Sequence, residues 1–175
     1  MKTHSGMRPQ DIVILLKLVC LGDLKWRYSD VAHDLEMSQS EIFESLERSR
    51  IAGLVDGKKR KVFRLAFLEF LTYGLRYAFP VEPGPISRGM PTAHSAPPLV
   101  EKIMSSDIEN YVWPTEDGDC RGQTIRPLYS SVPAAAKKDP KLYQFLVLVD
   151  ALRVGRSREK KLAHEELKQR FKGEN

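Results

Sequence analysis

Residues 31–55 read VAHDLEMSQSEIFESLERSRIAGLV, and this stretch decides the predicted fold. Its first part has the apolar spacing of a short helix that ends before Met37. Ser38 and Glu41 then stand at capping-box spacing, at which each side chain can satisfy a free backbone amide at the start of a second helix. Gly53 is typical of the position just past a helix end. Two short helices joined by a tight turn are therefore expected, as in a helix-turn-helix.

The segments on either side of this pair complete an N-terminal unit. Residues 9–21 begin with proline, are strongly apolar and precede a glycine, which predicts a central helix covered on most sides. Residues 54–56 and 61–63 are expected to pair as two very short strands around a basic turn. A fourth helix is expected over residues 64–79, where both faces are apolar.

The quoted stretch resembles the MarR-like winged-helix regulators. The resemblance rests on the short helix with Ala32, the tight turn at Met37-Ser38, the serine-capped second helix and the ending at residues 52–55 that leads into a basic turn. It implies that the second helix enters the major groove of DNA and that the wing contacts the backbone. The resemblance covers about a third of the chain, and the turn is shorter than the hairpin usual in that family.

The outward face of the second helix supplies the candidate base contacts. Gln39 can pair with adenine, and Ser40 can reach a base or a phosphate. Glu44 and Glu47 repel phosphates unless one accepts a hydrogen bond from cytosine or pairs with Arg48. The residues expected to contact DNA are Ser38, Gln39, Ser40, Phe43, Glu44, Arg48, Arg50, Lys58, Lys59, Arg60 and Lys61.

The distribution of charge supports an anionic partner. The chain has 175 residues, a formal net charge of +5 and a pI near 9.2. Residues 48–64 carry seven basic residues against one acid, and cations on a turn can follow a phosphate backbone without sequence preference. A second basic block begins at Arg153. We interpret that block as a solvated terminal helix, because Asp150 and Arg153 are spaced for a local ion pair.

The chain is expected to divide into three parts. Residues 1–79 form the winged helix-turn-helix domain, and residues 80–98 contain six prolines and form an extended connector. Residues 99–175 form a C-terminal region of unknown role. The expected fold class is mainly α, with an N-terminal winged helix-turn-helix and a C-terminal helical region that contains a small β-hairpin.

Local signals predict the elements of the C-terminal region. A short amphipathic helix is expected over residues 99–110. Residues 111–113 and 123–125 flank a Gly/Asp-rich turn and predict the hairpin. Two helices are expected to close the chain, one from Asp139-Pro140 to about residue 154 and one from Ser157 to about residue 171.

These patterns favour a cytoplasmic DNA-binding transcriptional regulator that binds double-stranded DNA as a homodimer. The helix over residues 64–79 has more apolar side chains than one face needs to bury, so it is a candidate dimer surface. Alternatively, residues 99–171 of the same chain cover it. The alternative function is a protein-interaction adaptor, or an antitoxin-like partner of a two-gene pair, and Glu44 and Glu47 on the reading face favour it.

Other classes of function have little support in the sequence. The four histidines are scattered, and Cys20 and Cys120 make neither a zinc pattern nor a disulfide framework. A glycine-rich phosphate loop is absent from the sequence. No catalytic residue, metal or cofactor is therefore expected. The N-terminus has no apolar signal core, and the most apolar stretch, residues 62–79, is too short and charged to span a membrane comfortably.

Overall fold

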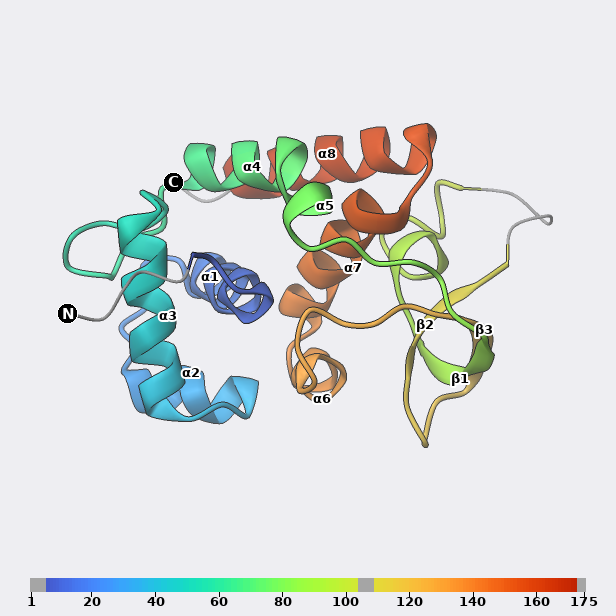
Figure 1. The fold of residues 1–175 in the computed structure, drawn as a ribbon, viewed down its shortest axis with the longest axis horizontal. Helices are drawn as coiled ribbons and strands as arrows, with labels where there is room; N and C mark the ends of the chain where they lie inside the picture. The colour runs from blue at the N-terminus through green and yellow to red at the C-terminus, as the bar shows by residue number, and fades with distance from the viewer. Residues whose placement is uncertain (1–5, 104–108, 173–175) are drawn as a thin grey trace.

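The protein is mainly α-helical in a computed structural model that describes residues 6–103 and 109–172 (Figure 1). The helices of the described residues are α1 (Pro9–Leu21), α2 (Tyr28–Leu35), α3 (Gln39–Ile51), α4 (Arg64–Tyr73), α5 (Leu75–Ala78), a 3-10 turn (Ala93–Ser95), α6 (Val132–Lys138), α7 (Pro140–Val154) and α8 (Ser157–Lys172). The strands are β1 (Ile86–Pro91), β2 (Tyr111–Pro114) and β3 (Cys120–Thr124).

The first three helices lie where the sequence predicts them. Gly22 ends α1 with a positive φ of 57°, and Gly53 follows α3 with a φ of 77°, a backbone conformation that glycine adopts at little cost. Ser38 is the N-cap of α3. The expected pair of short strands after α3 is a single β-bridge between Val55 and Val62. The loop between them is therefore a short turn and not an extended hairpin.

The fourth helix is interrupted and partly covered. It breaks at Gly74, so α4 and α5 replace the single helix expected over residues 64–79. Phe67 and Leu71 of α4 are buried, and α8 lies beside α4 along one side of the molecule (Figure 1). The outer side of α4 carries exposed apolar side chains. The alternative that the same chain covers this helix therefore holds for one face, and the dimer surface stays a prediction for the exposed face.

One hydrophobic core runs through both halves of the chain, so the predicted boundary near residue 80 does not separate two cores. Helix α7 packs against α1, α6 and α8. Lys17 of α1 adds a polar link, because its ammonium lies 2.9 Å from both Asp34 of α2 and Asp139 before α7. Burial alone would lower the pKa of Lys17, but the bonds to the two carboxylates outweigh burial and raise that pKa.

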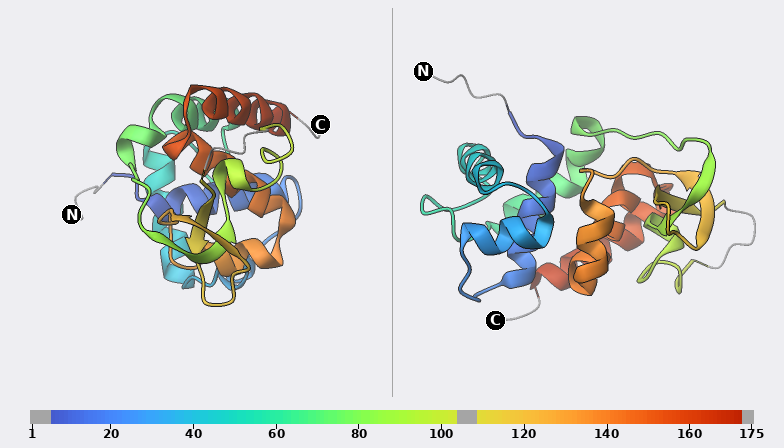
Figure 2. Two further views of the ribbon diagram at one scale, coloured as in Figure 1. Left: turned by 90° about the vertical axis from the view of Figure 1, so that its right-hand side faces the viewer. Right: turned by 90° about the horizontal axis from the view of Figure 1, so that it is seen from below.

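The predicted β-hairpin is wrong. Strand β1, which comes from the proline-rich segment, pairs antiparallel with both β2 and β3. The two strands expected to form the hairpin pair with each other in parallel, with Tyr111 opposite Gln123. The proline-rich segment is thus part of the sheet. The sheet lies at one end of the molecule and α2 and α3 at the other (Figure 2).

Three further features differ from the predictions or complete them. Residues 99–102 are a turn and not the start of a helix, and residues 104–108 of that expected helix lie outside the described residues. Helix α6 was not predicted. The two closing helices lie at α7 and α8 as expected, and the ion pair between Asp150 and Arg153 is confirmed at 2.9 Å. None of the helices in the described ranges has the length and hydropathy needed to cross a bilayer.

Candidate nucleic-acid interface

Helix α3 lies on the outside of the molecule, at the end opposite the sheet (Figure 1). Its inner side is buried and includes Ile42 and Leu46, which pack in the common core together with residues of α1 and α2. On its outer side, Gln39, Ser40 and Phe43 are exposed. The second half of the chain therefore leaves this face of α3 uncovered.

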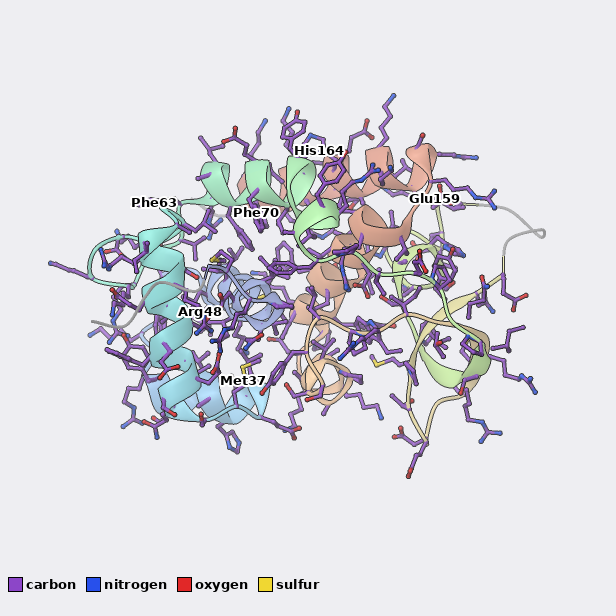
Figure 3. All side chains as sticks on the ribbon, viewed as in Figure 1. Met37, Arg48, Phe63, Phe70, Glu159 and His164 are labelled. Carbon is purple, nitrogen blue, oxygen red and sulfur yellow. The ribbon has the colours of Figure 1, made fainter. Side chains whose placement is uncertain are left out.

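Arg48 does not lie on this outer face, which corrects one predicted contact. Its side chain is only 8% exposed and its Nη2 lies 2.7 Å from Asp11 Oδ1 and 2.7 Å from Glu41 Oε1. The hydrogen bonds with Asp11, ahead of the opposing effect of burial, raise the pKa of the Arg48 guanidinium. Arg48 therefore joins α3 to α1 (Figure 3) and is not available to a phosphate.

The start of α3 is held by one half of the predicted capping box. Ser38 Oγ accepts a hydrogen bond from the backbone amide of Glu41 at 3.1 Å. The Glu41 carboxylate does not return this bond, because it accepts from Arg48 and from Gln10 Nε2 at 3.2 Å. The cap fixes the first turn of α3, where Ser38, Gln39 and Ser40 are all exposed.

Glu47 pairs with two of the predicted DNA-contacting cations. One of its carboxylate oxygens lies 2.7 Å from Arg50 Nη2, and the other lies 2.7 Å from Lys59 Nζ. The hydrogen bond from Arg50, followed by that from Lys59, lowers the pKa of Glu47 to about 2. Glu47 pairs with Arg50 and Lys59 and not, as considered from the sequence, with Arg48. The outward face of α3 thus carries an internal ion-pair cluster beside the exposed Glu44.

The basic turn is fixed by Asp56. Its Oδ1 accepts hydrogen bonds from the backbone amides of Arg60 at 2.6 Å and Lys61 at 2.8 Å. The backbone bond from Lys61 in particular lowers the pKa of Asp56. Lys59 has a positive φ of 58°. The turn is therefore tight and well bonded although it contains only one β-bridge.

An aromatic surface that the sequence interpretation missed holds the tip of this turn. The Arg60 guanidinium carbon lies 4.4 Å from the centre of the Trp26 ring, and Arg60 Nη1 donates to the Trp26 carbonyl at 3.0 Å. The Lys59 ammonium lies 4.3 Å from the centre of the Phe43 ring. Tyr28 lies edge-on to both Trp26 and Phe43. Such cation–π contacts attach the turn to α2 and α3. The alternation of basic and aromatic residues in Lys-Trp-Arg-Tyr, residues 25–28, is the signal that could have revealed this surface.

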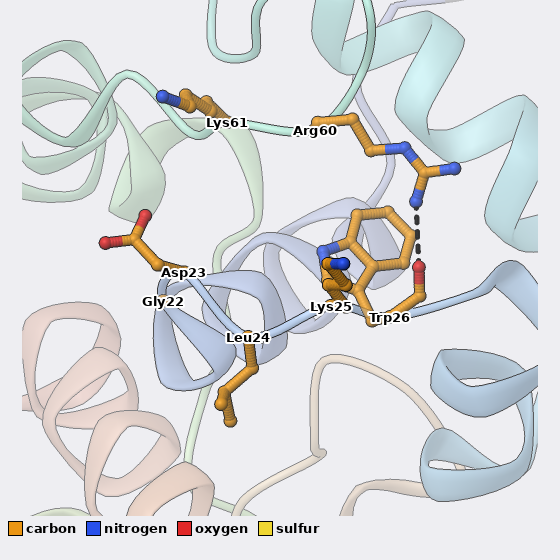
Figure 4. A pocket seen from close by; sticks show the side chains of 7 residues that line it. All are labelled: Gly22, Asp23, Leu24, Lys25, Trp26, Arg60 and Lys61. Carbon is orange, nitrogen blue, oxygen red and sulfur yellow. Dashed lines mark hydrogen bonds between the residues drawn. The ribbon is translucent and has the colours of Figure 1, made fainter.

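A hollow of about 380 Å³ lies between the turn and the loop after α1. It is lined by residues 22–26, Arg60 and Lys61. Figure 4 shows Arg60 over the Trp26 indole, with Asp23 and Lys61 away from that contact. Trp26 therefore forms one wall of an open depression whose charged side chains are mainly basic.

Lys58 and Lys61 are the predicted turn cations that stay unpaired. Both are exposed, and neither forms an ion pair with any residue in the described ranges. Lys59 and Arg60, by contrast, are held by Glu47, Phe43 and Trp26. Of the predicted turn cations, Lys59 thus lies against Phe43 of α3, whereas Lys61 lines the hollow beside Trp26.

Comparisons with known proteins identify no family for this chain. No protein-family model matches the chain, and neither a curated protein nor a solved structure matches it. Within the part of the chain that the structure describes, no three His, Cys, Asp or Glu side chains are grouped so that they could hold a metal ion. Cys20 and Cys120 are free and half-buried.

Proposed function

We propose that this chain is a cytoplasmic DNA-binding transcriptional regulator of the winged helix-turn-helix type. The outward face of α3 enters the major groove of double-stranded DNA, and the turn over residues 57–61 contacts the backbone. The observation that carries the proposal is the exposed N-terminal half of α3, together with a basic turn that Lys59 joins to Phe43 of that helix.

Each part of this surface has a chemical role in the proposal. Gln39 and Ser40 are short polar side chains on the first turn of an exposed helix, where recognition helices contact base edges. Phe43 can make apolar contact with a thymine methyl group. Lys58 and Lys61 supply the positive charge that binds phosphates in any sequence.

The ion-pair cluster around Glu47 shapes this interaction. Arg50 and Lys59 share the single negative charge of Glu47 in the free protein, so part of their positive charge is offset. A phosphate near the end of α3 competes with Glu47 for these cations. The proposed site therefore has a modest attraction for the backbone, which favours reading of sequence over non-specific binding.

A second candidate function is a protein-interaction adaptor, or an antitoxin-like partner of a two-gene pair. The observation that favours it is the acidity of the α3 face, where Glu44 and Glu47 are both accessible. A basic partner surface would pair with these carboxylates, whereas DNA would be repelled by them.

Purification of the full chain at low salt separates the two functions. A DNA-binding protein retains nucleic acid that raises its absorbance at 260 nm, and washing at high salt removes that nucleic acid. Selection of bound duplexes from a random pool then yields a preferred sequence. A stoichiometric protein partner, with no enrichment of any duplex, contradicts the proposed function and supports the adaptor.

A further inference from the structure

A strip of apolar side chains on the outer side of α4 and α5 is uncovered in the chain. Leu65 is 81% exposed, and Tyr73 and Tyr77 are each 72% exposed. Phe67 and Leu71, on the opposite side of α4, are buried. Isolated apolar side chains at a surface need no explanation, but three large ones on two consecutive short helices favour a surface that binds another protein.

A groove lies directly beside this strip. It has a volume of about 510 Å³ and is lined by Met7, by residues 52–54 after α3 and by one side of α4, including Phe70. Figure 3 shows Phe70 on the side of α4 that faces α1. Glu69 and Tyr73 also line this groove. The protruding strip and the groove are therefore neighbours on one face.

Two opposite charges that form no ion pair with a described residue accompany the strip. Glu69 and Arg76 are exposed, and neither forms an ion pair with any described residue. The Arg76 guanidinium carbon lies 4.8 Å from the centre of its neighbour's ring, that of Tyr77. An unpaired acid on α4 and an unpaired base on α5 give this face charges of both signs.

We propose that a second copy of this chain binds this face, with a twofold axis near Tyr73. In a twofold contact the same surface is used by both copies, so it must be complementary to itself. This face meets that condition because it carries a protrusion and a groove, and an acid and a base. With the axis near Tyr73, Glu69 of one copy lies opposite the segment around Arg76 of the other.

The proposed dimer leaves the proposed DNA-contacting face of α3 accessible. Residues 52–54 place the groove at the C-terminal end of α3, whereas Ser38, Gln39 and Ser40 lie at its start. A partner on the groove therefore leaves the start of α3 uncovered. The inference gives a location to the homodimer expected from the sequence, and it does not depend on DNA being the ligand of α3.

Sedimentation equilibrium of the full chain without DNA tests this inference. We expect the wild type to be a dimer at micromolar concentration and Tyr73→Glu to be a monomer, because the substitution places a charge at the centre of the contact. Leu24→Glu is the matched control, since Leu24 is 67% exposed on the loop after α1, and it should remain a dimer. Circular dichroism melts of the two variants show whether each is folded.

Charge reversal gives a second measurement that does not rely on an apolar substitution. Glu69→Arg and Arg76→Glu should each weaken the dimer about tenfold, and the double variant should regain most of the loss. The inference is overturned if the wild type is still a monomer at a concentration about 100-fold above micromolar. It is also overturned if Tyr73→Glu remains a dimer. Failure of the double variant to recover overturns the twofold pairing of Glu69 with Arg76. A dimer that binds no duplex contradicts only the proposed function, and a monomer that binds duplex contradicts only the dimer.

Discussion

Arg48 of α3 and Asp11 of α1 form a buried ion pair in which two guanidinium nitrogens reach the carboxylate. Arg48 Nη2 lies 2.7 Å from Asp11 Oδ1, and Arg48 Nε lies 2.9 Å from Asp11 Oδ2. Asp11 also accepts a hydrogen bond from the backbone amide of Arg8, at 2.8 Å. One carboxylate thus caps α1 and fixes the rotation of α3, so that Gln39 faces outward.

Loss of the Arg48 cation should destabilise the fold strongly. Arg48→Met leaves the Asp11 carboxylate buried without its partner, which costs about 3–5 kcal/mol in typical buried pairs. Urea denaturation measures the free energy of unfolding. Arg50→Met is the matched control, because the Arg50–Glu47 pair is exposed and should change this free energy little. Equal losses in the two variants would show that the buried pair does not fix α3.

The unpaired lysines of the turn should contact phosphates. Lys58→Ala should weaken binding to every duplex and reduce the slope of log K against log salt by about 0.9, the value for one phosphate contact. Lys161→Ala on the exposed side of α8 is the control and should leave both quantities unchanged. Fluorescence anisotropy at several salt concentrations provides the slopes. An unchanged slope in Lys58→Ala excludes this lysine from the interface.

A substitution at Glu47 distinguishes the two candidate functions, because it should change the affinity for the ligand in opposite directions. Glu47→Gln removes a negative charge from the reading face and releases Arg50 and Lys59. If the ligand is DNA, affinity at low salt should rise by roughly threefold to tenfold. If the ligand is a basic protein surface, the same substitution should weaken binding. Calorimetric titration of the wild type and the variant with the purified ligand reads this sign.

The signals that predicted the fold correctly are local ones. Proline followed by a dense apolar run fixed the limits of α1 and α7, and Ser38 fixed the start of α3. The strand order could not be obtained in this way, because β1 pairs with partners 21 or more positions away along the chain, such as Pro91 with Val112 and Gly89 with Pro114. A short apolar segment carries no information about which distant strand it joins.

The candidate site shows the same contrast. Exposure of Gln39 and Ser40 follows from helical periodicity, and the structure agrees with it. Arg48 was expected at the interface because it belongs to the basic block of residues 48–64, and its buried partner, Asp11, lies 37 positions away along the chain. The contact of Arg60 with Trp26 joins residues 34 positions apart. Only the folded arrangement shows that this wing cation is already engaged.

The turn should loosen in acid. Because hydrogen bonds hold the pKa of Asp56 below its ordinary value of 3.8, this carboxylate stabilises the folded turn above that value, and the stabilisation is lost as the pH falls through the lowered pKa. The amide resonances of Arg60 and Lys61 should therefore titrate together with a midpoint below 3.8. In Asp56→Ala this titration should vanish. A midpoint at or above the ordinary pKa would contradict the hydrogen bonds to the Asp56 carboxylate.

The most direct test is an NMR titration of the labelled full chain with its selected duplex. The proposed function predicts that the largest shift changes fall on residues 38–50 and on Lys58 and Lys61, and that amides of the sheet formed by β1, β2 and β3 stay unchanged. Changes confined to the sheet, or no change at saturating duplex, would contradict DNA binding through α3.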